Sequence, residues 1–219
     1  MAQDGPDLTF AEWVGYLFDN PPGFAWFDRL ADWGTLAPPT LVSYLARLFT
    51  RAGPLLAPYT DAQVAQSLWF LAGSSGALGA LLDAEVPWPA RQGALRAIGP
   101  LFTGCFAPRC TPALSHLDEG GVGPLNGVCY MWWDLFPTWG QPALAQQAAL
   151  DAEVLTLLAR LLAVPADACR ESALHGLGHW AAAYPARVEA IITTWVRAQS
   201  GLRPELHRYA DAARHGCVL

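Results

Sequence analysis

Apolar residues recur at spacings of three and four positions through almost the whole chain, and this periodicity constrains the fold more than any other feature. Val64, Leu68 and Leu71 give one example. Such spacing places apolar side chains on one face of an α-helix, and the alternating or β-branched runs typical of strands are nearly absent. Breaks such as Pro38-Pro39 and Gly120-Gly121 divide the chain into helices of about 10 to 18 residues. The sequence therefore predicts an all-α protein.

Helix starts and short connections indicate a single domain. Thr9 and Thr60 are followed three residues later by Glu12 and Gln63, which is the pattern of a capping box at a helix N-terminus. The chain has 219 residues, and this length suits one large domain. No stretch between the expected helices is long enough to require a division into two domains. We expect one all-helical domain over residues 1–219.

Two distant segments are similar to each other. Residues 91–99 read RQGALRAIG and residues 170–178 read RESALHGLG, so Arg, Ala, Leu and Gly coincide. Further helices fit the same frame at spacings of about 30 to 45 residues, which suit paired helices stacked as repeats. On these segments the chain resembles the HEAT-like and armadillo-like α-solenoids. The resemblance implies a compact right-handed α-solenoid of irregular HEAT-like helical hairpins over residues 60–200, in a family made mostly of protein-binding scaffolds with a few enzymes.

The first part of the chain does not follow this pattern. Residues 1–55, which include Trp13, Trp26 and Trp33 among many phenylalanines, fit no repeat. We expect them to form atypical N-terminal helices.

Composition excludes several classes of function. All 13 basic residues are arginines, so chemistry that needs a lysine amine is excluded, including the lysine of a phosphate-binding loop, a pyridoxal Schiff base and a kinase ion pair. The net charge is −6 and the isoelectric point is near 5.2. Nucleic acid is therefore an unfavourable partner, because neutralising phosphates supplies most nonspecific affinity for it.

Cysteine usage and hydropathy predict the setting of the protein. The five cysteines are an odd number in a chain too large to need disulfides, which indicates a reducing, cytoplasmic environment. The first residues are acidic and give no sign of a secretory signal, and the uncharged stretch 63–82 contains too many polar residues and glycines for membrane insertion. Only 15% of residues are charged and 10 are tryptophans. The surface must therefore be largely neutral and apolar, which favours a protein partner and makes self-association possible.

A candidate binding face follows from the repeat register and a turn of 100° per residue. One row reads Gln66, Arg96, Tyr130 and His175, and the next includes Phe70, Asp134 and His179. We expect these side chains to lie opposite the core and to be accessible, on the surface where stacked helices usually bind ligands. The alternative is an ordinary solvated face, with its aromatic residues buried against a further helix. The full set of candidate binding residues is Gln66, Trp69, Phe70, Arg96, Asn126, Tyr130, Trp133, Asp134, Glu171, His175 and His179.

His175 and His179 also raise the question of a metal site. Their spacing of four residues lets two imidazoles meet one ion, but the intervening Gly-Leu-Gly lacks the glutamate of a zincin helix. Glu171 lies about 12 Å along the helix from His179, which is too far for both to bind one ion. A third ligand would have to come from Asp134, His207, His215 or Cys217. Because the pair alone is incomplete, we expect no metal and no other cofactor.

Two functions remain after these exclusions. The first is a helical-repeat module that binds a macromolecule, which we expect to be a protein, with an inhibitory or immunity role as one version. The second is an enzyme that uses Asp134 with His175 or His179, either as a metal-dependent hydrolase or in the manner of the HEAT-like alkylpurine DNA glycosylases. The pair Trp133-Asp134 resembles the Trp and Asp of that glycosylase family, with Trp133 as a stacking platform. The acidic, lysine-free composition departs from it.

Overall fold

A computed structural model describes residues 8–26 and 36–218, and these residues are helical without any strand. The prediction of an all-α fold is confirmed. Trp33 lies outside the described residues. The α-helices of the described residues are α1 (Phe10–Phe18), α2 (Pro38–Thr50), α3 (Ala52–Leu56), α4 (Asp61–Trp69), α5 (Trp88–Leu101), α6 (Ala107–Arg109), α7 (Pro124–Tyr130), α8 (Trp132–Leu135), α9 (Ala148–Leu161), α10 (Asp167–Trp180), α11 (Pro185–Ala198) and α12 (Pro204–Arg214). Short 3₁₀ or π turns connect them at η2 (Phe70–Ser74), η3 (Ala77–Leu82), η4 (Phe102–Phe106), η5 (Ser115–Leu117) and η6 (Ala145–Gln147).

Local sequence signals determine where several helices begin. The Thr9 side chain accepts a hydrogen bond from the backbone N–H of Glu12, and the Glu12 carboxylate accepts one from the backbone N–H of Thr9. Thr60 and Gln63 form the same reciprocal pair at the start of α4. These hydrogen bonds confirm both predicted capping boxes. Each box satisfies backbone N–H groups that the first helical turn leaves without a partner.

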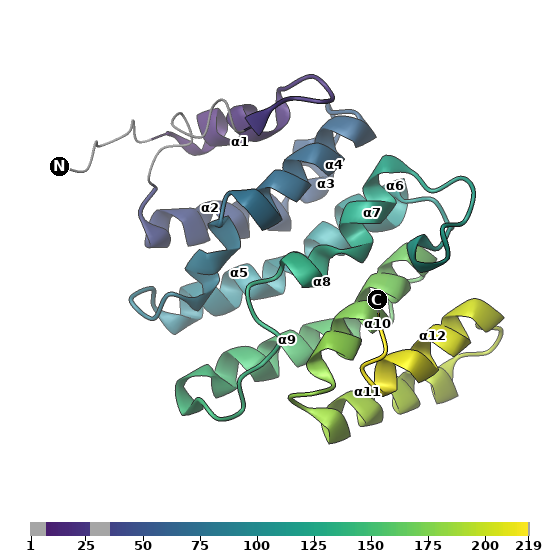
Figure 1. Cartoon of the computed structure of the whole chain (residues 1–219). Coiled ribbons are helices and arrows are strands. Elements are labelled where there is room, and N and C mark those ends of the chain that lie inside the picture. Colours follow the sequence, from purple (N-terminus) through teal and green to yellow (C-terminus); the bar gives the residue numbers. More distant parts are fainter. Residues whose placement is uncertain (1–7, 27–35, 219) are drawn as a thin grey trace.

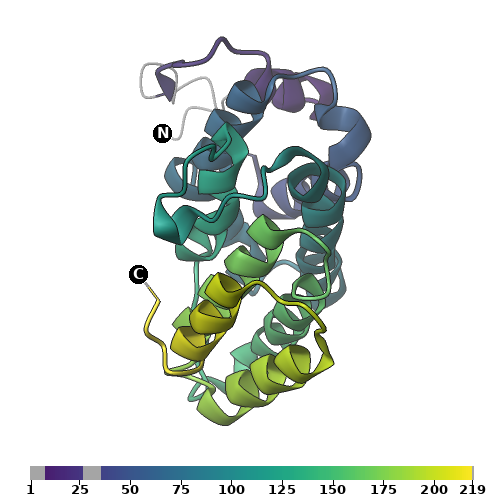
Figure 2. The same cartoon turned by 90° about the vertical axis from the view of Figure 1, so that its right-hand side faces the viewer.

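The helices stack in two layers (Figure 1). In one layer α2 packs against α5, α5 against α9, and α9 against α11. In the other layer α1 packs against α4, α4 against α7, and α7 with α8 against α10, which in turn packs against α12. Figure 2 shows α11 and α12 side by side at one end of the stack. A single core of buried side chains runs between the layers.

Helix α10 lies at the centre of the second half of the stack and is surrounded by neighbouring helices over most of its surface. It contacts α7 and α8 on one flank, α12 on the other, and α9 and α11 in the opposite layer. Most of its residues are buried, among them Glu171, Ser172 and His175. Polar groups on α10 therefore need partners inside the protein, because burying an unpaired polar group is costly.

The helices within residues 8–26 and 36–218 do not include a candidate membrane span. None of them combines the length and the apolar character needed to cross a bilayer.

Candidate metal centre

Two glycines between His175 and His179 allow the close packing that builds the site. A Cβ atom at Gly176 would lie 2.6 Å from the Trp133 ring, and one at Gly178 would lie 2.5 Å from Val218. Real Cβ atoms do not approach so closely, so a side chain at either position would push its neighbour away. Gly176 thereby lets the Trp133 indole lie directly on the backbone of α10. Asp134, the next residue on α8, is brought to the imidazoles by this contact.

Three potential metal-ligand atoms converge between α8 and α10. His175 Nε2 lies 2.6 Å from Asp134 Oδ2, and His179 Nε2 lies 3.0 Å from Asp134 Oδ1. The two Nε2 atoms are 3.1 Å apart. Among the described residues, Asp134, His175 and His179 form the group of histidine, cysteine and acidic side chains whose ligand atoms lie close enough to share one ion.

The side chains of Asp134, His175 and His179 differ in their access to solvent. The side chain of His175 is 1% exposed, whereas His179 and Asp134 are 18% and 24% exposed. The cluster is thus closed on the His175 side and open on the other. Burial lowers the pKa of His175 below its ordinary value of 6.5, and His179 lowers it further, although Asp134 opposes the shift. The neutral imidazole, which is the form that binds metals, is therefore favoured at His175.

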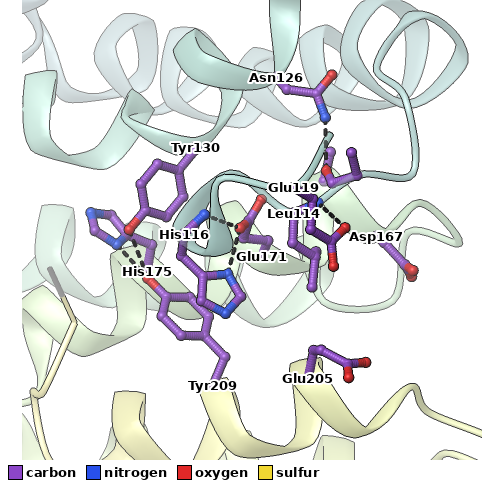
Figure 3. A network of polar contacts seen from close by, with 12 residues as sticks. Leu114, His116, Glu119, Asn126, Tyr130, Asp167, Glu171, His175, Glu205 and Tyr209 are labelled. Carbon is purple, nitrogen blue, oxygen red and sulfur yellow. Dashed lines mark hydrogen bonds and ion pairs between the residues drawn. The ribbon is translucent and has the colours of Figure 1, made fainter. Parts of the chain in front are cut away.

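A pair of tyrosines lies behind His175 (Figure 3). The Tyr209 hydroxyl is 2.7 Å from His175 Nδ1 and 3.2 Å from the Tyr130 hydroxyl. The Tyr130 ring also lies against the His175 ring, with 4.3 Å between their centroids. Burial raises the pKa of both tyrosines, so both phenols stay protonated at neutral pH and can donate hydrogen bonds.

Tyr209 is itself held in place by His116 and Glu171, as Figure 3 shows. The His116 ring stacks on the Tyr209 ring at a centroid distance of 4.0 Å. Glu171 Oε1 accepts hydrogen bonds from the backbone N–H of His116, at 2.9 Å, and from His116 Nδ1, at 2.6 Å. Glu171 is fully buried. This pair fixes the His116 ring, and the stacked His116 fixes the plane of Tyr209.

Trp139 covers His179 on the open side of the cluster. The two rings are nearly parallel, with a centroid distance of 4.7 Å. The Trp139 indole N–H donates to the backbone carbonyl of Trp133 at 3.0 Å, which anchors the ring, yet 48% of Trp139 remains exposed. An apolar wall therefore borders the position where solvent reaches the ligands.

The structure brings together only part of the predicted binding face. Asp134, His175, His179 and Tyr130 lie in one cluster, as the register requires. Arg96 does not join them, because α5 belongs to the other layer and its guanidinium is paired with Glu153 of α9. The predicted repeat register therefore placed Arg96 of one layer in the same row as Tyr130 and His175 of the other layer.

Several predicted face residues are not accessible, so that part of the prediction is wrong. Asn126, Trp133 and Glu171 are fully buried, and Phe70, Tyr130 and His175 are nearly so. The reason is that α7, α8 and α10 pack on more than one flank, whereas the prediction assumed a single buried face for each helix. Trp133 belongs to the core and provides no stacking platform.

The remaining predicted residues have local partners. Asn126 accepts from the backbone N–H of Thr111 and donates to the carbonyls of Thr111 and Ala113, so it holds a loop. Gln66 and Trp69 lie on α4 beside the loop at Gly23, to which the Gln66 carboxamide is hydrogen-bonded. Of the four candidates for a third ligand, Asp134 is the one beside the two imidazoles.

Sequence reasoning missed Tyr209, His116 and Trp139. Tyr209 lies on the apolar side of α12 and has the pattern of a core residue. His116 and Trp139 lie in connections between helices, where periodicity gives no information. The clue that was available is the pair of glycines at 176 and 178, which permits close approach of other segments to α10.

Comparison with known proteins finds no matching family model, no similar curated protein and no similar solved structure. The function is therefore inferred from the geometry of the cluster.

Proposed function

We propose that this protein is a metal-dependent hydrolase whose centre binds one divalent transition-metal ion through Asp134, His175 and His179. The observation that carries the proposal is the convergence of three ligand atoms at separations of 2.6 to 3.1 Å. Ligands placed about 2.0–2.2 Å from one ion in tetrahedral geometry are themselves about 3.3–3.6 Å apart, so shifts of up to about 1 Å would seat an ion among them. Two imidazoles and one carboxylate suit zinc and iron(II) better than magnesium or calcium.

The surroundings of the cluster support a catalytic role over a purely structural one. Structural zinc sites usually have four protein ligands, whereas catalytic sites have three and leave a position for water. The solvent-exposed edge between Asp134 and His179 supplies that position. An ion bound there would lower the pKa of its water toward neutrality and provide a nucleophile for hydrolysis. The exposed Trp139 ring would border the substrate.

Metal titration followed by activity assays tests this proposal. Metal-free protein, prepared with a chelator, is titrated with Zn²⁺, Fe²⁺ and Mn²⁺ in a calorimeter, and we expect one ion per chain. The double variant His175→Ala, His179→Ala should lose this binding. Loaded protein should hydrolyse chromogenic carboxylate or phosphate esters, and Asp134→Asn should abolish the reaction.

The matched control is His207→Ala. His207 pairs with Asp211 on the exposed face of α12, so its loss should leave the number of bound ions and the affinity unchanged. The proposal fails if the wild-type protein takes up no ion, or if uptake persists without His175 and His179. Binding without ester hydrolysis would keep the metal centre and reject the hydrolase.

A second candidate function is the binding of another protein, favoured by a groove whose lining includes none of the three proposed metal ligands. The groove measures about 690 Å³ and is lined by Phe24, Trp26, Gln66, Trp69 and Leu135, among others. Trp69 is among the exposed large apolar side chains, and exposed aromatic residues often anchor interfaces. Crosslinking in cells, followed by titration of the crosslinked partner, should show weaker binding to Trp69→Ala with an unchanged zinc affinity. Equal binding to the variant would reject this surface.

We infer in addition that the two layers are those of a compact right-handed α-solenoid with HEAT-like hairpins. The side-by-side stacking of α4, α7 and α10 supports this arrangement. A cytoplasmic location, expected from the odd number of cysteines, remains part of the proposal.

A further inference from the structure

We propose that Tyr209 is a positioning residue that lets the buried His175 move its ring proton from Nε2 to Nδ1 when a metal ion binds. This inference rests on the proposed metal centre and concerns how that centre is filled. The side chain of His175 has almost no access to water. Every proton on this ring must therefore point at a protein group.

Without an ion, the geometry favours a proton on Nε2. This atom lies 2.6 Å from Asp134 Oδ2, and a bare nitrogen lone pair at that distance from a carboxylate oxygen would be repelled. With Nε2–H donating to Asp134, Nδ1 carries a lone pair. The Tyr209 hydroxyl, 2.7 Å away, then donates to Nδ1, and the Tyr130 hydroxyl can donate to Tyr209.

With an ion bound to Nε2, the same neutral ring must carry its proton on Nδ1. His175 stays neutral in this exchange. The Nε2–H bond breaks and its proton leaves through Asp134, which is 24% exposed. The Nδ1–H bond forms with the proton of the Tyr209 hydroxyl, which is replaced by the proton of Tyr130 and that one in turn by a proton from solvent. Nδ1–H then donates to the Tyr209 oxygen. The hydroxyl hydrogen of Tyr209 turns away toward Tyr130, whose oxygen lies 3.2 Å from it. Nδ1 of His175 and the Tyr209 hydroxyl are therefore hydrogen-bonded in both states.

A hydroxyl is the group that this exchange requires. A backbone carbonyl or a carboxylate can only accept, so it would suit the metal-bound state alone. A phenol can donate or accept according to how its hydrogen is turned. The stacked His116, fixed by the fully buried Glu171, keeps the Tyr209 ring in place while its hydrogen reorients. We therefore assign the pair Glu171–His116 to holding Tyr209.

Nuclear magnetic resonance on protein labelled with ¹⁵N-histidine tests the exchange directly. Nitrogen shifts and couplings distinguish the two neutral tautomers. In the wild-type protein at pH 7.5 we expect His175 to carry its proton on Nε2 before Zn²⁺ is added and on Nδ1 afterwards. Observation of the same tautomer in both states would overturn the inference.

The variant Tyr209→Phe tests the energetic role of the hydroxyl. Groups that hydrogen-bond to a metal-binding histidine typically contribute 10- to 100-fold to affinity, so we expect the dissociation constant for Zn²⁺ to rise by about that factor. Tyr130→Phe, which removes only the acceptor of the turned hydroxyl, should give a smaller rise. Tyr44→Phe is the matched control, because its hydroxyl binds the carbonyl of Leu8 far from the cluster, and it should bind Zn²⁺ as the wild type does.

The outcomes separate this inference from the proposed function. If the wild-type protein binds Zn²⁺ and folded Tyr209→Phe binds it equally tightly, the role of Tyr209 is rejected and the metal centre stands. If the wild-type protein binds no Zn²⁺, both are rejected. If Tyr209→Phe does not fold, the tautomer measurement on the wild-type protein decides the question alone.

Discussion

Two carboxylates in this protein, Asp134 and Glu153, each receive hydrogen bonds from two side chains of a neighbouring helix. Glu153 on α9 accepts from Arg96 at 2.9 and 3.0 Å and from Gln92 at 2.8 Å, both on α5. Asp134 on α8 faces His175 at 2.6 Å and His179 at 3.0 Å, both on α10. Both arrangements join adjacent helices of one layer by a polar contact.

The donors of the two carboxylates differ in one chemical respect. The guanidinium nitrogens of Arg96 and the amide nitrogen of Gln92 always carry their protons, so the atoms that face Glu153 cannot become ligands of an ion. The imidazoles of His175 and His179 can move a ring proton and become ligands. The comparison shows that distance and count of hydrogen bonds do not identify a metal site. A metal site also requires that the atoms that donate these hydrogen bonds can lose their proton and bind an ion through the lone pair.

The chemical difference between the two sets of side chains predicts a large difference in zinc binding between two variants. A zinc site with four protein ligands is worth roughly 10–16 kcal/mol, so one ligand is worth about 3 kcal/mol and its loss should weaken binding by about 100-fold. We therefore expect His175→Ala to raise the dissociation constant for Zn²⁺ by at least this factor in calorimetry. Arg96→Ala, at the other carboxylate, should leave it unchanged. Equal losses in both variants would show that the two carboxylates do not differ as described.

A smaller effect is expected at Gly176, which permits the approach of α8 to α10. In Gly176→Ala the new methyl group would meet the Trp133 ring at 2.6 Å and Leu158 at 2.8 Å. Overpacking of this kind usually costs about 1–3 kcal/mol, and it would move Asp134 away from the imidazoles. Urea unfolding should show the lower stability, and calorimetry a weaker Zn²⁺ affinity.

Gly93→Ala is the control for this prediction. Gly93 lies on α5 with open space at its Cβ position, and alanine favours a helix more than glycine does. This variant should be as stable as the wild type or more so. If Gly176→Ala behaves in the same way, the close contact with Trp133 does not hold the site together.

The contribution of Glu153 to stability should depend on pH. The hydrogen bond from Arg96, followed by that from Gln92, lowers the pKa of Glu153 below its ordinary value of 4.5. The resulting stabilisation is present above pH 4.5 and is lost as the pH falls through the lowered pKa of the folded protein. Glu153→Gln should therefore be less stable than the wild type at pH 6, with a difference that shrinks toward pH 3. A difference that stays constant over this range would contradict the shift.

Local features of the fold could be predicted from the sequence, and packing between distant helices could not. Thr9 and Thr60 determine helix starts through residues three positions away, so their capping boxes are legible in the sequence. The pairing of His175 with His179 is likewise a property of one helix. Asp134, and not His207, His215 or Cys217, lies beside the two histidines because α8 packs against α10 there. This packing between helices could not be predicted from the sequence.

The internal repeat also shows that sequence similarity does not predict how distant helices pack. Residues 91–99 and 170–178 are similar, yet they form parts of α5 and α10, which lie in different layers. Where α5 has Ala97, α10 has Gly176. Because glycine has no side chain, the Trp133 ring can pack against α10 and Asp134 can reach the histidines. The periodicity of apolar residues does not reveal this difference.

The central claim is that one ion binds where Asp134, His175 and His179 meet. The most direct measurement is X-ray diffraction from crystals grown with Zn²⁺, recorded above and below the zinc absorption edge. The account predicts an anomalous peak about 2.0–2.2 Å from an Asp134 oxygen and from Nε2 of both histidines. A peak only at surface groups such as His207 and Asp211, with none at the cluster, would contradict it.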